Sequence, residues 1–556
     1  MKKIDLGVVV TTLIIVTISC SLAFFAARIV GKPKDINLVA KNVAITFTDT
    51  SSIADETISP GWNNVKSFTI TNNSKEDFNY NILLKGLVNT FESINTLQYK
   101  ITSDTGYNMD NYLNIVKTEN SKDVVLAYDI VIPKGSKQTY QVEFKYISID
   151  EDQSSDMGKR LSGTLAIEES TGKPKIYDKL LSDNPTIKTR TDFTSVYTET
   201  NTGKIFKSTE TNTPVYYFAG NTQNNWVKFG TWQENKTIIL GKTSDKKAYK
   251  LFSSISLCNA DSTYNTDCKE ITLGKKGDPM YWRIIRTNSD GSVRMLYAGT
   301  SVTGTDQALI DFSVFNESNG VEDTKYNGYM YGTSGSQANN RINENSSDIK
   351  KVIDNWYKVN LINYTKYLST TGVYCNDRSI VSNSGADRTH FAGNLRVSGR
   401  SVDGNWTENQ KVNPSYDCNT DIEGKKLSDA SVSDLFSVSN ISGNGKLTYP
   451  IALMTADEVV YAGGFPYNGA NAYYVMNGEN KSILNKIRWW LMTPGSTYIN
   501  STLFDVINLV EEDNCLNNDN ESDYLYGVRP VISIKENAIY KSGDGSPSNP
   551  YEIVTE

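Results

Sequence analysis

The chain contains 556 residues, with 56 Lys and Arg against 63 Asp and Glu, which gives a formal charge of −7. This length exceeds what one hydrophobic core normally organises and predicts two or three domains. No basic run occurs, and phosphate binding needs clustered Lys and Arg, so no nucleic-acid partner is expected. The single histidine, His390, also disfavours enzymes that depend on imidazole chemistry.

The N-terminus predicts a membrane anchor. An almost unbroken apolar run covers residues 6–27 and is flanked by basic residues, and about 20 apolar residues span a bilayer core as a helix. A cleaved signal peptide is the alternative, but Phe24 to Ala27 offers no clean cleavage site. We expect residues 1–28 to be an uncleaved anchor in the lipid bilayer. The cysteines and the long polar region after the anchor favour a single-pass cell-membrane protein with most of its chain outside the cell.

Five cysteines follow the anchor, so at most two disulfides form among them and one thiol remains. We expect Cys258 to pair with Cys268, closing a short hairpin loop, and Cys375 to pair with Cys418. Cys515 is then left over. No Cys-x-x-Cys occurs, which argues against a zinc ribbon or a thioredoxin-type motif.

Residues 29–170 predict an all-β sandwich. Short segments of alternating apolar and polar residues are separated by turn residues, without long helical segments, which is typical of such a fold. The expected strands cover residues 43–47, 65–71, 80–84, 124–131, 138–146 and 161–167.

Residues 36–169 contain a set of short motifs: Ser59-Pro60-Gly61, Lys66 to Asn73, Ile132-Pro133-Lys134-Gly135, Asp152-Gln153, Gly158 and Leu161-Ser162-Gly163-Thr164-Leu165. In these motifs the segment resembles the TasA/camelysin family of surface proteins. The resemblance implies a jelly-roll-like sandwich that is exported and, in some members, assembled into matrix fibres. Camelysins have been classed as metallopeptidases, but this segment contains no histidine and no His-Glu-x-x-His motif, so that activity is not carried over.

Residues 171–212 are interpreted as a linker. Lys173 to Leu181 predicts a short helix, and the Thr- and Asn-rich stretch after it lacks the apolar content for a core of its own. One hairpin around Ile205-Phe206 is possible within it. The last domain is expected to cover residues 213–556.

Within the last domain, residues 281–286 and 293–297 flank Asp290-Gly291 and predict a hairpin. Apolar residues from Ile349 to Trp356 recur at helical spacing, with Ser346 or Ser347 as the cap. The final expected elements are a strand at residues 451–454, a capping box from Thr455 to Glu458, a Trp489-Trp490 strand ended by Pro494-Gly495, and a strand at residues 527–534.

Together these elements resemble the C-type-lectin-like fold in its formylglycine-generating-enzyme branch, and more closely uncharacterised surface domains of Gram-positive bacteria. The resemblance implies an α+β domain. Formylglycine-generating enzymes bind copper through a close cysteine pair, and related sulfoxide synthases hold iron with three histidines. Cys515 and His390 are alone here, so no cofactor, no metal and no enzymatic activity are expected. The matching residues are 216–222, 282–286, 375–379, 447–451, 455–459, 527–532, 542–545 and 549–551.

Three charged residues of the last domain have a structural interpretation. Asp457 and Glu458 could be paired catalytic carboxylates, but helix capping explains both. Arg529 is expected to tie the last strand to a carboxylate or to carbonyl groups, with an anionic ligand as the alternative.

The residues between Tyr498 and Tyr526 are rich in Asn, Ser, Asp and Tyr and predict a long polar loop held by two core strands. Tyr and Asn supply amphipathic area and adaptable hydrogen bonds for sugar or protein recognition. A solvated loop is the alternative, as is calcium binding by its acidic residues. The candidate ligand-binding residues are Tyr498, Asn500, Asn517, Asp519, Asp523 and Tyr524.

The leading hypothesis is therefore a membrane-anchored bacterial surface protein that is not an enzyme. Its lectin-like domain would recognise an extracellular glycan or protein, with the sandwich as a stalk. A matrix or fibre component is the first alternative. A formylglycine-generating-enzyme-like oxidase is the second, disfavoured by the missing metal ligands.

Overall fold

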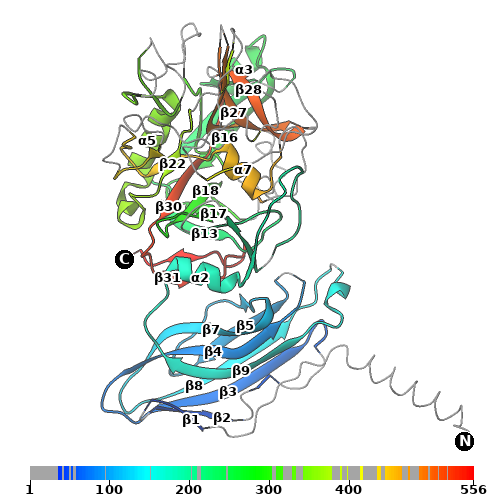
Figure 1. The fold of residues 1–556 in the computed structure, drawn as a ribbon, viewed down its shortest axis with the longest axis vertical. Coiled ribbons are helices and arrows are strands. Elements are labelled where there is room, and N and C mark those ends of the chain that lie inside the picture. The colour runs from blue at the N-terminus through cyan, green and yellow to red at the C-terminus, as the bar shows by residue number, and fades with distance from the viewer. Residues whose placement is uncertain are drawn as a thin grey trace, which may run out of the picture. The chain divides into compact units, whose positions relative to one another are not determined.

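The computed structural model divides the chain into two compact units, residues 1–186 with 539–544 and residues 187–538 with 545–556 (Figure 1). Among the described residues, no helix is both long and apolar enough to span a membrane. The predicted anchor, residues 1–28, lies outside the described residues. These are residues 36–40, 43–48, 52–53, 58–93, 95–150, 152–201, 203–208, 214–245, 248–302, 308–316, 328–333, 342–378, 388–390, 397, 414–416, 435–439, 445–465, 474–475, 488–498, 501–510, 513–521 and 524–555.

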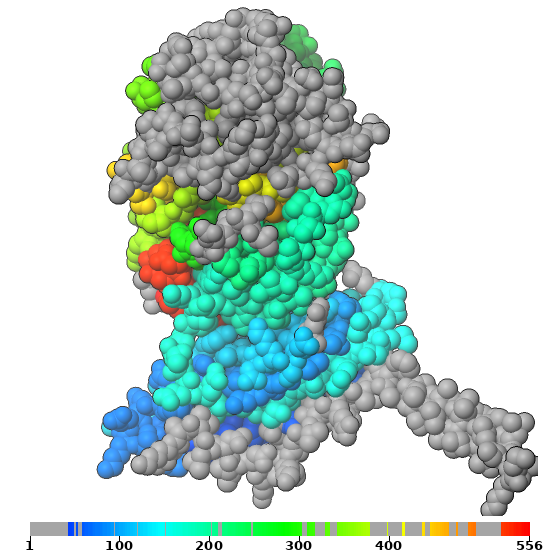
Figure 2. Space-filling model, viewed as in Figure 1, coloured from blue at the N-terminus to red at the C-terminus, as the bar shows by residue number. Residues whose placement is uncertain are grey.

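The first unit is a two-sheet sandwich, whose surface is coloured blue to cyan in Figure 2. One sheet has the strand order β1-β2-β3-β8-β5-β6 and the other has the order β7-β4-β9. Alternate side chains of β8 from Tyr140 to Tyr146 are buried, because successive strand side chains point to opposite faces. They join Phe68, Ile82 and Leu165 in one core. The predicted all-β sandwich is confirmed. Its strands are β1 (Ile36–Ala40), β2 (Val43–Phe47), β3 (Asn63–Asn72), β4 (Phe78–Asn89), β5 (Leu97–Ser103), β6 (Leu113–Asn114), β7 (Thr118–Ile132), β8 (Lys137–Tyr146) and β9 (Leu161–Glu169), with the 3-10 helix η2 (Ser154–Asp156).

Helix α2 (Ile176–Asp183) belongs to this unit and overlaps the helix predicted at Lys173–Leu181. Its buried Lys179 forms an ion pair with Asp183, one turn later, at 2.6 Å between Nζ and Oδ1. The same ammonium lies 5.2 Å from the ring centroid of Tyr540. The helix is thus bound to a residue from the far end of the chain.

Residues 539–544, which include β31 (Tyr540–Ser542), return to the first unit. The backbone N–H of Tyr540 donates to the carbonyl of Pro174 at 2.9 Å. The carboxylate of Asp544 accepts from the backbone N–H and the side-chain amide of Asn114 at 2.8 and 2.9 Å. The sandwich is therefore completed by a segment that follows it by more than 350 residues.

The second unit is built around the hairpin of β17 and β18. Their antiparallel register confirms the hairpin predicted around Asp290-Gly291. The turn is closed by Asn288, whose N–H donates to the carbonyl of Ser292 at 2.8 Å. The sheet has the order β10-β11-β12-β17-β18-β30-β25, and β13 also pairs with β17. Its strands are β10 (Thr186–Lys188), β11 (Lys204–Ser208), β12 (Val215–Tyr217), β13 (Trp226–Thr231), β17 (Pro279–Thr287), β18 (Val293–Gly299), β25 (Ile451–Leu453) and β30 (Pro530–Ile534).

Helices and small sheets surround this sheet. The predicted helix is α5 (Asp348–Asn360), and Ser347 caps it by accepting from the N–H of Lys350 at 3.1 Å. The other elements are β14 (Lys236–Lys242), β15 (Tyr249–Phe252), α3 (Ile255–Ala260), β16 (Thr266–Gly274), β20 (Met330–Tyr331), β21 (Asn345–Ser346), η4 (Ile362–Tyr367), β22 (Tyr374–Cys375), β24 (Leu435–Phe436), α7 (Ala456–Ala462) and β32 (Glu552–Ile553).

A further sheet corrects two expectations. Its order is β19-β29-β26-β27-β28, and β23 pairs with β26. Pro494-Gly495 does not end the Trp489-Trp490 strand, because the register shifts on both sides of Pro494 and such irregularities tolerate a residue without an N–H. Most of the predicted loop between Tyr498 and Tyr526 forms two strands. The elements are β19 (Asp311–Ser313), β23 (Arg388–His390), β26 (Trp489–Tyr498), β27 (Ser501–Val510), β28 (Asp513–Glu521) and β29 (Tyr526–Val528).

Candidate functional site

The candidate site is the meander of β26, β27 and β28, and its base is fixed in the core of the second unit. Trp490 is fully buried, and its indole N–H donates to the carbonyl of Ser313 at 2.9 Å. Its ring centroid lies 4.8 Å from that of Tyr526 and 5.6 Å from that of Phe315. Aromatic area and a satisfied donor hold this end of β26 in one position.

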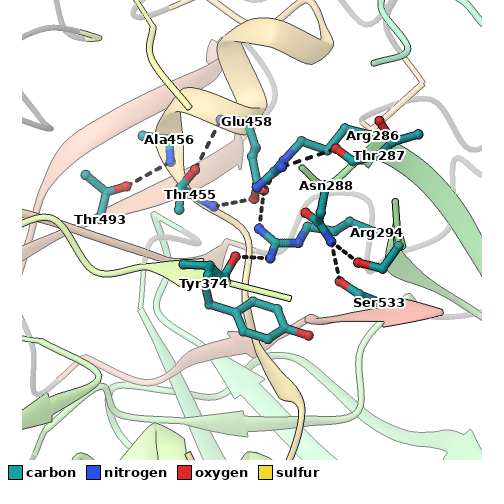
Figure 3. Close-up of polar contacts among 12 residues, drawn as sticks. Arg286, Thr287, Asn288, Arg294, Tyr374, Thr455, Ala456, Glu458, Thr493 and Ser533 are labelled. Carbon is teal, nitrogen blue, oxygen red and sulfur yellow. Dashed lines mark hydrogen bonds and ion pairs between the residues drawn. The ribbon is translucent and has the colours of Figure 1, made fainter. Parts of the chain in front are cut away.

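Helix α7 is hydrogen-bonded to a buried residue of β26. The backbone N–H of Ala456 donates to the hydroxyl of Thr493 at 2.9 Å (Figure 3). Thr455 and Glu458 form the predicted capping box, in which the hydroxyl of Thr455 accepts from the N–H of Glu458 at 3.2 Å. The carboxylate of Glu458 accepts from the N–H of Thr455 at 3.1 Å. These bonds occupy N–H groups that a helix start otherwise leaves unsatisfied.

The same carboxylate lies between two buried guanidinium groups (Figure 3). Oε1 of Glu458 accepts from Nε of Arg286 at 2.9 Å and from Nη1 of Arg294 at 2.7 Å. Arg286 and Arg294 are directly opposite each other in the β17–β18 hairpin. Like charges in that position repel, and Glu458 offsets this repulsion by pairing with both arginines.

The environment of Glu458 determines its protonation. Burial alone would raise the pKa of this carboxyl, but Arg294 and Arg286 outweigh burial and hold the pKa below its ordinary value. Burial and the neighbouring Arg294 lower the pKa of Arg286. The two ion pairs give this carboxylate a structural role, because they join helix α7 to the β17–β18 hairpin. Asp457 also has a local partner, since it accepts from the N–H of Ser415 at 2.8 Å.

Arg529 ties the last core strand to carbonyl groups, as predicted. Its Nε donates to the carbonyl of Tyr297 at 2.7 Å, and its Nη1 donates to that of Val475 at 2.9 Å. Its guanidinium also lies 5.1 Å from the ring centroid of Trp489, at the base of the meander. The structural interpretation of Arg529 is therefore confirmed.

Arg283 is a buried cation that the sequence analysis did not single out. Its Nε donates to the side-chain oxygen of Asn225 at 2.7 Å, and its guanidinium lies 4.3 Å from the ring centroid of Trp226. Burial, with a smaller effect of the nearby Arg529, lowers the pKa of Arg283 to about 9. A charged residue inside the apolar run from Trp282 to Ile285 was the available signal.

The structure distributes the predicted ligand-binding residues along the meander. Tyr498 ends β26 opposite Ser501, at the β26–β27 turn. Asn517 pairs with Val506, which pairs with Trp490 at the base. The backbone of Asp519 also lies in β28, and Tyr524, 41% exposed, precedes β29. Asn500 and Asp523 lie outside the described residues. The register therefore places Tyr498 and Asn517 at opposite ends of the meander.

Cysteine and histidine positions complete the description. Cys258 and Cys268, the expected pair, form a disulfide with 5.9 Å between their Cα atoms. Cys375 is also disulfide-bonded, and its expected partner Cys418 lies outside the described residues. The backbone of His390 pairs with Ser496 in β23. Within the described part of the chain, no group of three His, Cys, Asp or Glu residues is placed to hold a metal ion.

No protein-family model matches this chain, and no curated protein matches it. Solved structures with weak similarity include a chaperone–tip adhesin complex of CFA/I fimbriae biogenesis, at 11% identity over 40% of this chain and 84% of that chain, with a TM-score of 0.07. The class 5 fimbriae chaperone CfaA matches at 11% identity over 42% of this chain and 85% of that chain, with a TM-score of 0.08. The pilus backbone RrgB of Streptococcus pneumoniae matches at 12% identity over 46% of this chain and 87% of that chain, with a TM-score of 0.09. Such low TM-scores carry no argument about function.

Proposed function

We propose that this chain is a membrane-anchored bacterial cell-surface protein that recognises an extracellular glycan or protein and has no catalytic activity. In this proposal the first unit is the stalk and the second is a lectin-like recognition domain. Residues 6–27 hold the protein in the bilayer. The sequence resemblances to the TasA/camelysin family and to the C-type-lectin-like fold support these assignments.

The observation that carries the proposal is that a chain segment rich in polar residues is joined to a base fixed in the core. At its base, Trp489 to Met492 are buried and Thr493 is bonded to helix α7. The chain between Tyr498 and Tyr526, which includes β27 and β28, is rich in Asn, Asp and Ser. A polar segment supported by rigid core strands is a common arrangement for binding, because the scaffold limits the entropy lost when a ligand binds.

A binding array with a matched pair of tyrosine variants tests this function. The folded full chain is applied to glycans and to bacterial and host surface proteins. Tyr524 and Tyr107 have nearly equal exposure, 41% and 40%, but Tyr107 lies in the first unit. We expect Tyr524→Ala to weaken any interaction found and Tyr107→Ala to leave it unchanged. The absence of any interaction by the folded chain, or equal effects of the two variants, would contradict the proposal.

A further inference from the structure

The outer edge of β28 is the feature that carries a further inference. In the described residues β28 ends its sheet and pairs only with β27. A terminal strand presents a row of main-chain N–H and C=O groups that an extended chain can pair with. Proteins commonly protect such edges with charged side chains, Pro, bulges or a very short strand. β28 has nine residues without Lys or Pro, and its own protection is three carboxylates and one register shift.

The register defines which part of this edge is regular. Residues Asp513 to Asn517 pair one for one with Val506 to Val510, and the register shifts beyond that stretch, between Val506 and Phe504. Alternate residues of a regular antiparallel strand direct their main-chain groups toward the partner strand and away from it. The regular edge is thus five residues long, enough for a short extended peptide.

The charge of the segment around β28 indicates which kind of peptide would bind at its edge. The segment from Trp489 to Val528 contains seven acidic residues and no Lys or Arg, so its formal charge equals that of the whole chain. Six of the seven lie between Glu511 and Asp523, in β28 or beside it. A second copy of β28 would bring like charges together, which disfavours self-pairing. A cationic segment would instead be attracted to this edge.

We propose that β28 binds a Lys- or Arg-rich extended peptide of a partner protein by adding it to the sheet as a further strand. Main-chain hydrogen bonds at Asp513 to Asn517 would supply the pairing, and the acidic segment would supply the preference for basic side chains. This inference rests on the proposed recognition function and assigns it a class of ligand.

The first test uses the unmodified full chain and a fluorescein-labelled heptapeptide in which Lys alternates with Thr. Two control peptides carry N-methyl groups on alternate amides, one in each frame, which remove hydrogen-bond donors but keep the charge. We expect fluorescence anisotropy to show binding of the parent peptide and at least tenfold weaker binding of one N-methylated form. Equal binding of all three peptides would show simple charge attraction and overturn the inference.

A second test places proline at adjacent positions, Asn514→Pro and Cys515→Pro. One of these amides faces β27 and the other faces the open edge, so we expect one variant to lose peptide binding while keeping the thermal stability of the parent chain. Retained binding in both variants would overturn the edge inference. Self-association of the full chain that the edge-facing proline abolishes would instead identify a second copy as the occupant, and also overturn it.

The two proposals fail in different ways. If ligands found on the array still bind both proline variants, the recognition function is retained and the β28 edge is excluded as its binding site. If the folded chain binds nothing on the array, the recognition function itself is refuted.

Discussion

Replacing Glu458 with Gln removes a carboxylate that Arg286 and Arg294 share. Gln keeps the size of the side chain and an oxygen that can accept from the N–H of Thr455, so the capping box can persist while the charge is lost. Removing one partner of a buried ion pair costs about 3–5 kcal/mol, because the remaining charge stays buried without compensation. We expect a loss of that size for the second unit, since two guanidiniums would remain opposite each other.

Equilibrium unfolding in urea, followed by tryptophan fluorescence, measures this loss. Seven of the eight tryptophans belong to the second unit and only Trp62 to the first, so the signal reports the unit that contains Glu458. The matched control is Glu234→Gln, an exposed carboxylate in the same unit, which we expect to change stability by less than about 0.5 kcal/mol.

A double variant tests the electrostatic reason. Arg294→Met in the Glu458→Gln background removes one of the two buried charges, and we expect it to recover about 1–2 kcal/mol of the loss, within the usual range for coupled residues. A loss below about 1 kcal/mol for Glu458→Gln, or no recovery in the double variant, would refute the claim that Glu458 neutralises the arginine pair.

Three further predictions concern acid stability, the chain end and the disulfide. The folded-state pKa of Glu458 is lowered, so the stabilising effect of its carboxylate is present above the ordinary pKa of 4.5 and is lost as the pH falls through the folded-state pKa. We therefore expect the urea stability of the second unit to depend less on pH below 4.5 in Glu458→Gln than in the parent chain. Tyr540→Ala, which removes a ring that contacts Tyr128 and Lys179, should destabilise the first unit by about 3–5 kcal/mol and speed hydrogen exchange in β4 and β8, whereas Tyr107→Ala should not. Cys268→Ser opens a loop closed by a disulfide across 10 residues, and we expect it to lower stability by about 2–3 kcal/mol and to speed hydrogen exchange in β14 and β16. Cys515→Ser, which removes no predicted disulfide, is the control. Equal hydrogen exchange in the two variants would contradict the disulfide assignment.

Several elements were predictable because they depend on residues close together in the chain. The β17–β18 hairpin follows from Asp290-Gly291 between apolar runs, and the capping box follows from Thr455 and Glu458 at their fixed spacing. The sandwich strands follow from alternation, although β5 was not predicted. Its buried Leu97 and Ile101 alternate with polar residues, which was the available signal.

The meander shows where local pattern was misread. The sequence of β27 contains Leu503, Phe504, Val506 and Ile507, residue types that favour strands. The Asn- and Asp-rich residues on either side led to the prediction of a loop. Pro494 was likewise interpreted as the end of β26, although a register shift accommodates it.

The sequence by itself determined the β-rich character of the chain, its main hairpin and the helix caps, because these depend on periodicity and on neighbours a few residues apart. The tertiary structure alone decided which distant groups meet. The hairpin register brings Arg286 opposite Arg294, but their neutralisation depends on Glu458, 164 residues after Arg294. Tyr540 completes a sandwich at the other end of the chain for the same reason. Pairings of this kind depend on how the core packs, and no local pattern encodes them.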